Sequence, residues 1–191
     1  MPSKTDKSPA KTPTWSELRK TLSELEKPEL IDLLQQLYKL NADNKVFLMT
    51  RLYEPGEVDF DALAEPYRKV IRQEFNPARG FPDMKLSVAR KALNDFKKTT
   101  NTPMAVVDLL LFYVEQGVVC TNNYGDIDEA FYNSHISAYA EAAKRVREAN
   151  DPELTEHFRP RAQKIVRATS GIGWGFHDEL SEIYYNEYPS E

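Results

Sequence analysis

The sequence predicts an all-α protein of about eight or nine helices, packed as αα-hairpins around a central apolar helix at residues 103–120. Three observations lead to this prediction. Apolar residues recur at helical spacing from Thr14 onward, and no segment shows the alternation of a convincing strand. Prolines also follow capping residues where helices are expected to start.

Length and composition indicate an ordinary globular chain. Its 191 residues can bury one substantial core, and 41% of them are hydrophobic and 29% charged. The net charge of −5 gives no overall attraction to nucleic acid or to an anionic membrane. Cys120 is the only cysteine, so no intramolecular disulfide can form. Together with the lack of a secretory signal, this leads us to expect a cytoplasmic protein.

The first 13 residues differ from the rest. They hold three prolines and three lysines, and no large apolar side chain follows Met1. Such a segment buries too little to offset its chain entropy, so residues 1–13 are predicted to be a disordered tail. Residues 14–191 are expected to form a single helical domain.

Two short helices are predicted after the tail. Thr14 and Glu17 have the spacing of a capping box, and Pro28 fits the first turn of the second helix. The apolar stripes are Trp15, Leu18, Leu22 and Leu25, then Leu30, Leu33, Leu34, Leu37 and Tyr38. The pair is similar to small helix–turn–helix nucleic-acid modules, but residues 17–34 carry five acids and only three bases. We therefore expect an αα-hairpin that packs its leucines inward.

The later helices are predicted from the same periodicity. A third helix, or a continuation of the second, covers residues 46–53. The remaining stripes are Leu63, Tyr67, Val70, Ile71 and Phe75; Leu86, Ala89, Leu93 and Phe96; Phe131, Ala138, Tyr139, Ala142 and Val146; Leu154, Phe158, Ala162, Ile165 and Val166; and Phe176, Leu180, Ile183 and Tyr184. Asp151 is predicted to cap the helix that starts at Pro152, and Pro160 predicts a kink or a one-turn restart within it.

The central helix opens at Thr102 and Pro103 and is apolar almost all round. Its most apolar run, residues 104–114, is shorter than the ~20 residues of a membrane span, so a buried helix is expected. Asp108 interrupts this run and is expected to pair with a lysine or arginine from a neighbouring helix. A functional acid is the alternative interpretation.

Basic residues are concentrated between residues 76 and 98, a segment with six bases and two acids. The candidate binding residues on this face are Arg79, Arg90 and Lys91, and an RNA-binding alternative adds Lys85 and Lys98. Stacking proteins interleave such bases with exposed aromatic residues, and this segment does not. A solvated helix face is therefore expected, and the sequence argues against a nucleic-acid partner.

No pattern of metal ligands or nucleophiles is complete. The three histidines lie far apart, at positions 135, 157 and 177, and no HExxH motif is present. Neither a metal nor another cofactor is expected. His135 shares a stripe with Phe131 and Tyr139 and is interpreted as a satisfied, partly buried histidine. Cys120 is interpreted as a small buried side chain rather than a nucleophile.

The segment "SGIGWGFHDELSE" at residues 170–182 alternates three glycines with apolar residues. Its GxGxG spacing differs from phosphate-binding motifs, and Asp178 in the next helix would repel an anion. We expect a hinge in which Trp174 and Phe176 are buried anchors. The alternative is a surface pocket with Trp174 as a wall and His177 as its polar group, which makes Trp174, His177 and Asp178 candidate binding residues.

Three stretches carry a family resemblance: "LRKTLSELEKPELIDLLQQLY", "VVDLLLFYVEQG" and "GIGWGFHDELSEIY". Together they resemble DUF6155, an uncharacterised family of small bacterial helical proteins, over about residues 14–188. The resemblance implies an all-α cytoplasmic protein and assigns no activity. We expect a binding or interaction module without catalytic activity, which leaves a protein partner open and involves no membrane. The enzyme alternative is a hydrolase or transferase that uses His177 with Asp178 or Glu179 beside Trp174.

Overall fold

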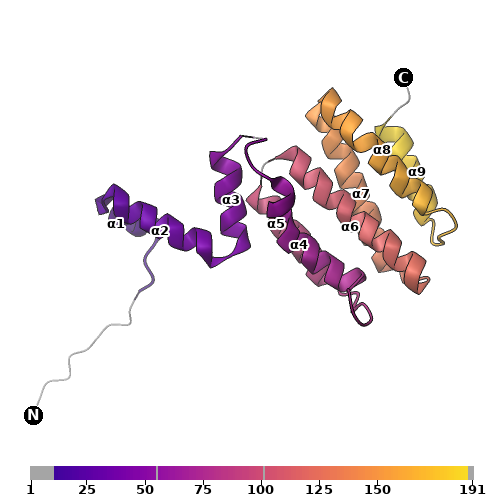
Figure 1. The fold of residues 1–191 in the computed structure, drawn as a ribbon, viewed down its shortest axis with the longest axis horizontal. Helices are drawn as coiled ribbons and strands as arrows, with labels where there is room; N and C mark the ends of the chain where they lie inside the picture. The colour runs from indigo at the N-terminus through magenta and orange to yellow at the C-terminus, as the bar shows by residue number, and fades with distance from the viewer. Residues whose placement is uncertain (1–10, 55, 101, 189–191) are drawn as a thin grey trace, which may run out of the picture.

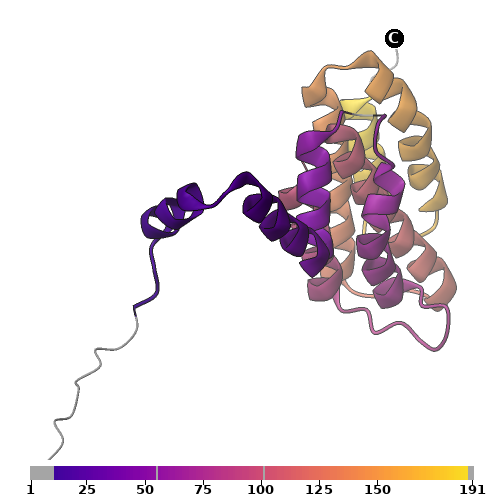
Figure 2. The ribbon, with the colours of Figure 1, turned by 60° about the vertical axis from the view of Figure 1, so that its left-hand side comes forward.

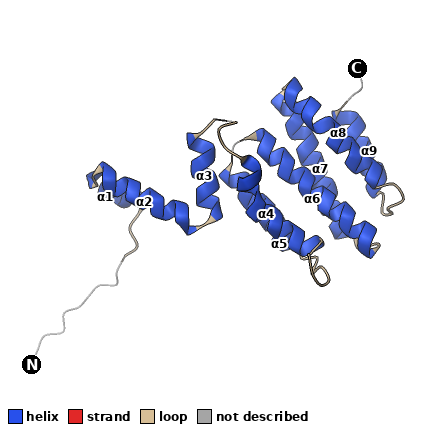
Figure 3. Cartoon of the chain, in the orientation of Figure 1, coloured by secondary structure: helices blue, strands red, loops and turns tan. Residues whose placement is uncertain are grey.

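A computed structural model describes residues 11–54, 56–100 and 102–188, and these residues form nine helices and no strand (Figures 1 and 3). The all-α prediction is therefore confirmed for the described part of the chain. Residues 1–10 of the predicted tail lie outside the described residues. The helices are α1 (Trp15–Glu24), α2 (Lys27–Leu40), α3 (Ala42–Leu52), α4 (Phe60–Phe75), α5 (Leu86–Thr99), α6 (Pro103–Tyr124), α7 (Glu129–Ala149), α8 (Pro152–Ala168) and α9 (Phe176–Glu187).

The predicted capping residues hold the helix starts. The Thr14 backbone N–H donates to Glu17 Oε2 over 2.6 Å, and the Glu17 N–H donates to the Thr14 hydroxyl, which completes a capping box. The Asp151 carboxylate accepts from the backbone of Glu153 at the start of α8. These bonds satisfy N–H groups that have no partner within the helix.

The structure answers two points that the sequence left open. Residues 42–52 form a separate helix, because the Asn41 side chain accepts a hydrogen bond from the Asn44 N–H and starts a new helix there. Helix α8 runs through Pro160 without a restart. Helix α4 also contains a proline, Pro66.

Helix α6 is the centre of the bundle, as predicted. It packs against α4, α5, α7 and α8, and twelve of its 22 residues are buried. Helix α9 packs on α7 and α8 and closes the far side (Figure 1). By length and composition α6 could cross a membrane, but 67% of its most apolar window is buried within the fold.

A histidine lies at the heart of the bundle. The His135 side chain is fully buried among aromatic rings, stacked on Tyr113 with 4.5 Å between ring centroids. Its Nδ1 donates to the Phe131 carbonyl over 2.8 Å, and burial lowers the pKa of His135 to about 4. Gly117 makes room for the ring, because a Cβ at this position would lie 2.2 Å from it. His135 is thus more deeply buried than the sequence suggested.

Helices α1 and α2 extend away from this bundle (Figures 1 and 2). Neither helix has a buried residue, and α2 packs against α3. The prediction that this pair packs its leucines inward is therefore wrong. Amphipathic spacing indicates that one face suits burial, but it does not supply a surface to cover that face. We call residues 15–40 the arm.

Candidate functional site

The glycine segment links α8 to α9 with unusual backbone geometry. Gly171 and Gly175 have φ of 84° and 69°, which glycine adopts easily. Trp174 has φ of 60°, a conformation that costs a bulky residue energy. The segment, which we call the hinge, thus turns directly into the first turn of α9.

The two aromatic residues of this hinge differ. Phe176 is fully buried, as predicted, whereas Trp174 is 56% exposed, so the prediction of a buried Trp174 is wrong. The Trp174 Nε1 donates to Asp126 Oδ2 over 2.6 Å, and the Tyr132 hydroxyl donates to Asp126 Oδ1 over 2.5 Å. The Tyr132 bond and then the Trp174 bond lower the pKa of Asp126. The left-handed backbone turns the indole outward, and Asp126 fixes it at the surface.

A shallow pocket of about 440 Å³ lies beside this hinge. It is lined by the end of α6, the loop that follows it and the first glycines of the segment: Thr121, Asn122, Gly125, Asp126, Ser170, Gly171, Ile172 and Gly173. His177 lies outside this lining, and its Nδ1 lies 2.9 Å from the Thr169 hydroxyl. Asp178 is exposed in the first turn of α9. None of the predicted Trp174, His177 and Asp178 therefore lines this pocket.

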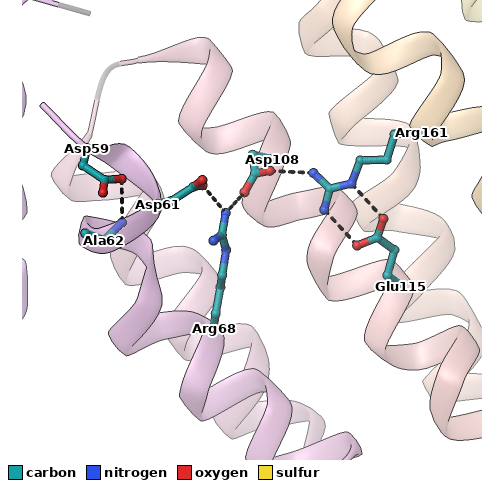
Figure 4. Close-up of polar contacts among 7 residues, drawn as sticks. All are labelled: Asp59, Asp61, Ala62, Arg68, Asp108, Glu115 and Arg161. Carbon is teal, nitrogen blue, oxygen red and sulfur yellow. Dashed lines mark hydrogen bonds and ion pairs between the residues drawn. The ribbon is translucent and has the colours of Figure 1, made fainter. Parts of the chain in front are cut away.

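Asp108 belongs to a chain of ion pairs that joins three helices (Figure 4). It contacts Arg68 from α4, and its Oδ1 lies 2.5 Å from Arg161 Nη1 from α8. Arg68 also pairs with Asp61 over 2.8 Å, and Arg161 pairs with Glu115 over 2.7 Å. The prediction of an arginine or lysine partner is confirmed. The sequence did not identify these two arginines, because helical spacing does not indicate which helices face each other.

A second pocket, of about 330 Å³, opens beside this network. Asp59, Asp61, Asp108 and His157 contribute its titratable side chains. The Asp59 carboxylate accepts from the Ala62 N–H as the cap of α4. Both Asp108 oxygens contact arginines, so this acid serves to hold helices together. Across the described residues, no group of three or more His, Cys, Asp or Glu side chains could hold a metal ion.

The predicted basic face is largely paired within the fold. Arg90 Nη1 donates to the Ser134 carbonyl over 3.3 Å, and Lys91 pairs with Asp95 within α5. Further pairs join Lys85 to Asp83, Lys97 to Glu141 and Lys98 to Asp95. Arg79 is exposed in the loop between α4 and α5. These contacts account for most of the positive charge locally, which favours the solvated-face interpretation.

The arm is the largest feature that sequence analysis did not single out. Seven of the eighteen large hydrophobic side chains that are exposed in the described structure lie on its two helices: Trp15, Leu18, Ile31, Leu33, Leu34, Leu37 and Leu40. Their exposed fractions range from 38% to 71%. Exposed apolar residues concentrated on one part of a chain mark interaction sites more often than isolated exposed residues do.

Comparison with known proteins places the chain in a family and gives it no activity. No curated protein and no solved structure matches it. The sequence model of one family, described as a family of unknown function, matches residues 14–188. The resemblance to this family is thereby confirmed, and the chain belongs to the family of unknown function DUF6155.

Proposed function

We propose that this protein is an interaction module without catalytic activity and that its arm is the docking element. One observation carries the proposal: α1 and α2 together expose seven large apolar side chains and bury no residue. A stripe of leucines on a helix surface is stabilised only when another apolar surface covers it.

Helix stability supports the same conclusion. Helices α1 and α2 contain 10 and 14 residues. Isolated helices shorter than about 12–15 residues are marginal in water, and most helical stability in proteins comes from packing of an apolar face. The two capping boxes at Thr14 and Glu26 favour the helices locally, but they leave the apolar face uncovered. A bound partner supplies the missing packing.

Charge favours a protein partner over the alternatives. Residues 14–40 carry five acids and four bases. Phosphate binding requires an excess of bases, and an interfacial membrane helix has a polar face rich in lysine and arginine. The arm has neither, and its leucine stripe matches helix-to-helix recognition.

The residues with potential for catalysis are engaged elsewhere. Cys120 is buried, and burial raises its pKa to about 11, which keeps it a thiol. Asp108 is held by Arg68 and Arg161, and His135 is fully buried in the core. Of the hydrolase or transferase alternative, His177 lies against the Thr169 hydroxyl, and neither Trp174 nor His177 lines the pocket beside the glycine segment. These observations support a binding role over that alternative.

Site-specific photo-crosslinking in the cells that carry the gene tests the docking role. A photoreactive residue replaces Leu34 in the arm or Tyr185 on α9, since both side chains are exposed. We expect a discrete adduct from position 34 only, and its loss when Leu33→Glu and Leu37→Glu are added. Equal adducts from both positions, or none from position 34, would contradict the proposal.

A further inference from the structure

We propose that the partner of the arm is a second copy of this chain, so that two arms pack into one four-helix bundle. This inference rests on the proposed docking role and names its occupant. It follows from the spacing of the apolar residues, the area they expose, the charge of each helix and the position of the arm.

The spacing is that of a helix-bundle seam. On α1, Trp15, Leu18 and Leu22 follow steps of three and four residues, and Leu25 comes directly after the helix as its C-cap. On α2, Leu30, Leu33, Leu37 and Leu40 follow steps of three, four and three residues. These are the a and d positions of two heptads, which interlock in coiled coils and four-helix bundles. Each copy therefore supplies two matching helices, and two copies supply the four that such a bundle needs.

The exposed area is that of a dimer interface. Burying a large aliphatic side chain removes roughly 60–120 Å² from water, from ~1.5–3 kcal/mol at ~25 cal/mol per Å². Trp15, with 69% of its surface exposed, contributes more. Because these side chains are only 38% to 71% exposed, the seven together offer on the order of 400 Å² of apolar area per copy. This is close to the apolar share, about 57%, of the ~800 Å² that each partner buries in a standard specific interface.

The charges permit self-association. Helix α1 carries two acids and two bases, and α2 also carries two of each. Either helix can therefore face either helix of the second copy without net repulsion, and acids of one copy can meet bases of the other. A symmetric contact of this kind uses the same patch twice, as in most homodimers.

The arm is also placed where two copies can meet. It projects away from the bundle formed by α4 to α9, as two views show (Figures 1 and 2). Two arms can therefore come together while the two bundles remain apart. Helix α3 supports the arm: it packs on α2 and on α5, and the Thr50 hydroxyl donates to the Thr99 carbonyl over 3.1 Å.

The mass of the purified full chain in solution tests the inference. Light scattering after size exclusion, over a series of concentrations, should give twice the chain mass of 22.0 kDa. Leu33→Glu with Leu37→Glu should weaken association at least about a hundredfold, since each copy must bury two charges and tenfold corresponds to about 1.4 kcal/mol. Tyr185→Glu, an exposed change outside the arm, should leave the dimer intact.

Neither arm residue is buried in the single chain, so the double variant should keep the thermal midpoint of the bundle at low concentration, and any loss of helical circular dichroism should be confined to the share of α1 and α2. A wild-type chain that stays at single-chain mass at the highest concentration would overturn the inference. So would a double variant that folds and remains a dimer.

Cross-linking identifies the surface independently. In a Cys120→Ser background, a single cysteine at position 34 should give a cross-linked dimer with a bifunctional thiol reagent, and one at position 185 should not. Cross-linking from position 185 alone would show that the interface lies outside the arm, and it would overturn the inference.

The two proposals fail in different ways. If the purified chain is monomeric but its position-34 probe forms an arm-dependent adduct with another protein in cells, the dimer is refuted and the docking role is retained. A monomeric chain without any arm adduct would remove both.

Discussion

Helices α6 and α2 both have a proline in the first turn and several leucines or valines, but their surroundings differ. Helix α6 buries twelve of its 22 residues, whereas α2 buries none. Helix α6 is surrounded by four helices, whereas α2 packs on α3 and otherwise faces outward. The comparison shows that apolar spacing specifies which face of a helix suits burial, while the remainder of the fold, or a partner, determines what covers it.

The strongest test of this comparison is to make the same substitution in both helices. Leu110→Ala in α6 should lower the free energy of unfolding by about 2–5 kcal/mol, because Leu110 is fully buried and its loss leaves a cavity. Leu37→Ala in α2 should change it by about 0.5 kcal/mol or less, since Leu37 is 41% exposed. Denaturant unfolding at low protein concentration measures both. Equal losses would mean that the arm packs on the bundle in solution.

Acid titration tests the bundle alone. The pKa of His135 is lowered to about 4 in the folded chain and is about 6.5 when unfolded, so the unfolded chain binds a proton first. The free energy of unfolding should therefore fall by about 3 kcal/mol as the pH drops from about 6.5 to about 4. In His135→Phe, which lacks the titrating ring, the free energy of unfolding should depend less on pH across this range. A slope that is unchanged in this variant would refute a buried neutral His135.

The ion-pair chain of Figure 4 sharpens the comparison for polar residues. Asp108→Ala should cost about 1–3 kcal/mol, since Arg68 and Arg161 each lose one carboxylate and keep another. Asp83→Ala, which removes an exposed partner of Lys85, should leave the melting temperature nearly unchanged. Thermal melts of the two variants provide the test. A silent Asp108→Ala would mean that the network does not hold the helices.

Trp174→Ala should have a small effect, although Trp174 is the largest side chain of its segment. Trp174→Ala removes a half-exposed ring and one hydrogen bond to Asp126, so the loss should stay below about 1 kcal/mol. In a Trp15→Phe background, its fluorescence should be accessible to a soluble quencher. A blue-shifted emission that the quencher does not reduce would indicate that Trp174 is buried.

Two glycine substitutions distinguish the effect of a positive φ from the effect of steric crowding. Gly175→Ala should destabilise the hinge by roughly 1 kcal/mol, since Gly175 has φ of 69° and caps α9. Gly173→Ala should be nearly neutral, because no heavy atom lies within 4 Å of the added Cβ and its φ is not positive. Parallel thermal melts compare the two, and the reverse order would contradict the backbone assignment.

Most of the helices could be predicted from the sequence because their signals are local. The capping pair Thr14 and Glu17, the cap at Asp151 and the proline at the start of α6 each determine a boundary within one turn. Burial of α6 was equally predictable, because a helix that is apolar on all sides has no face suited to water.

The features that could not be predicted depend on which segments pack against each other in the fold. Asp108 predicted a cationic partner, but only the packing of α4 and α8 identifies Arg68 and Arg161. Trp174 was predicted to be buried because the alternating glycines allow the apolar side chains of its segment to fold back onto the core. In the structure its positive φ and its hydrogen bond to Asp126 keep it at the surface. The arm was misjudged for the same reason, since its leucines indicate a covered face and not the molecule that covers it.

The close fit of Gly117 and His135 has an evolutionary consequence. A Cβ at position 117 would lie 2.2 Å from the imidazole ring, and neither group can move toward solvent from the core. Relatives that carry a larger side chain at position 117 should therefore carry a smaller one at position 135. The two positions should be inherited as a pair, and drift at either one should be constrained by the other.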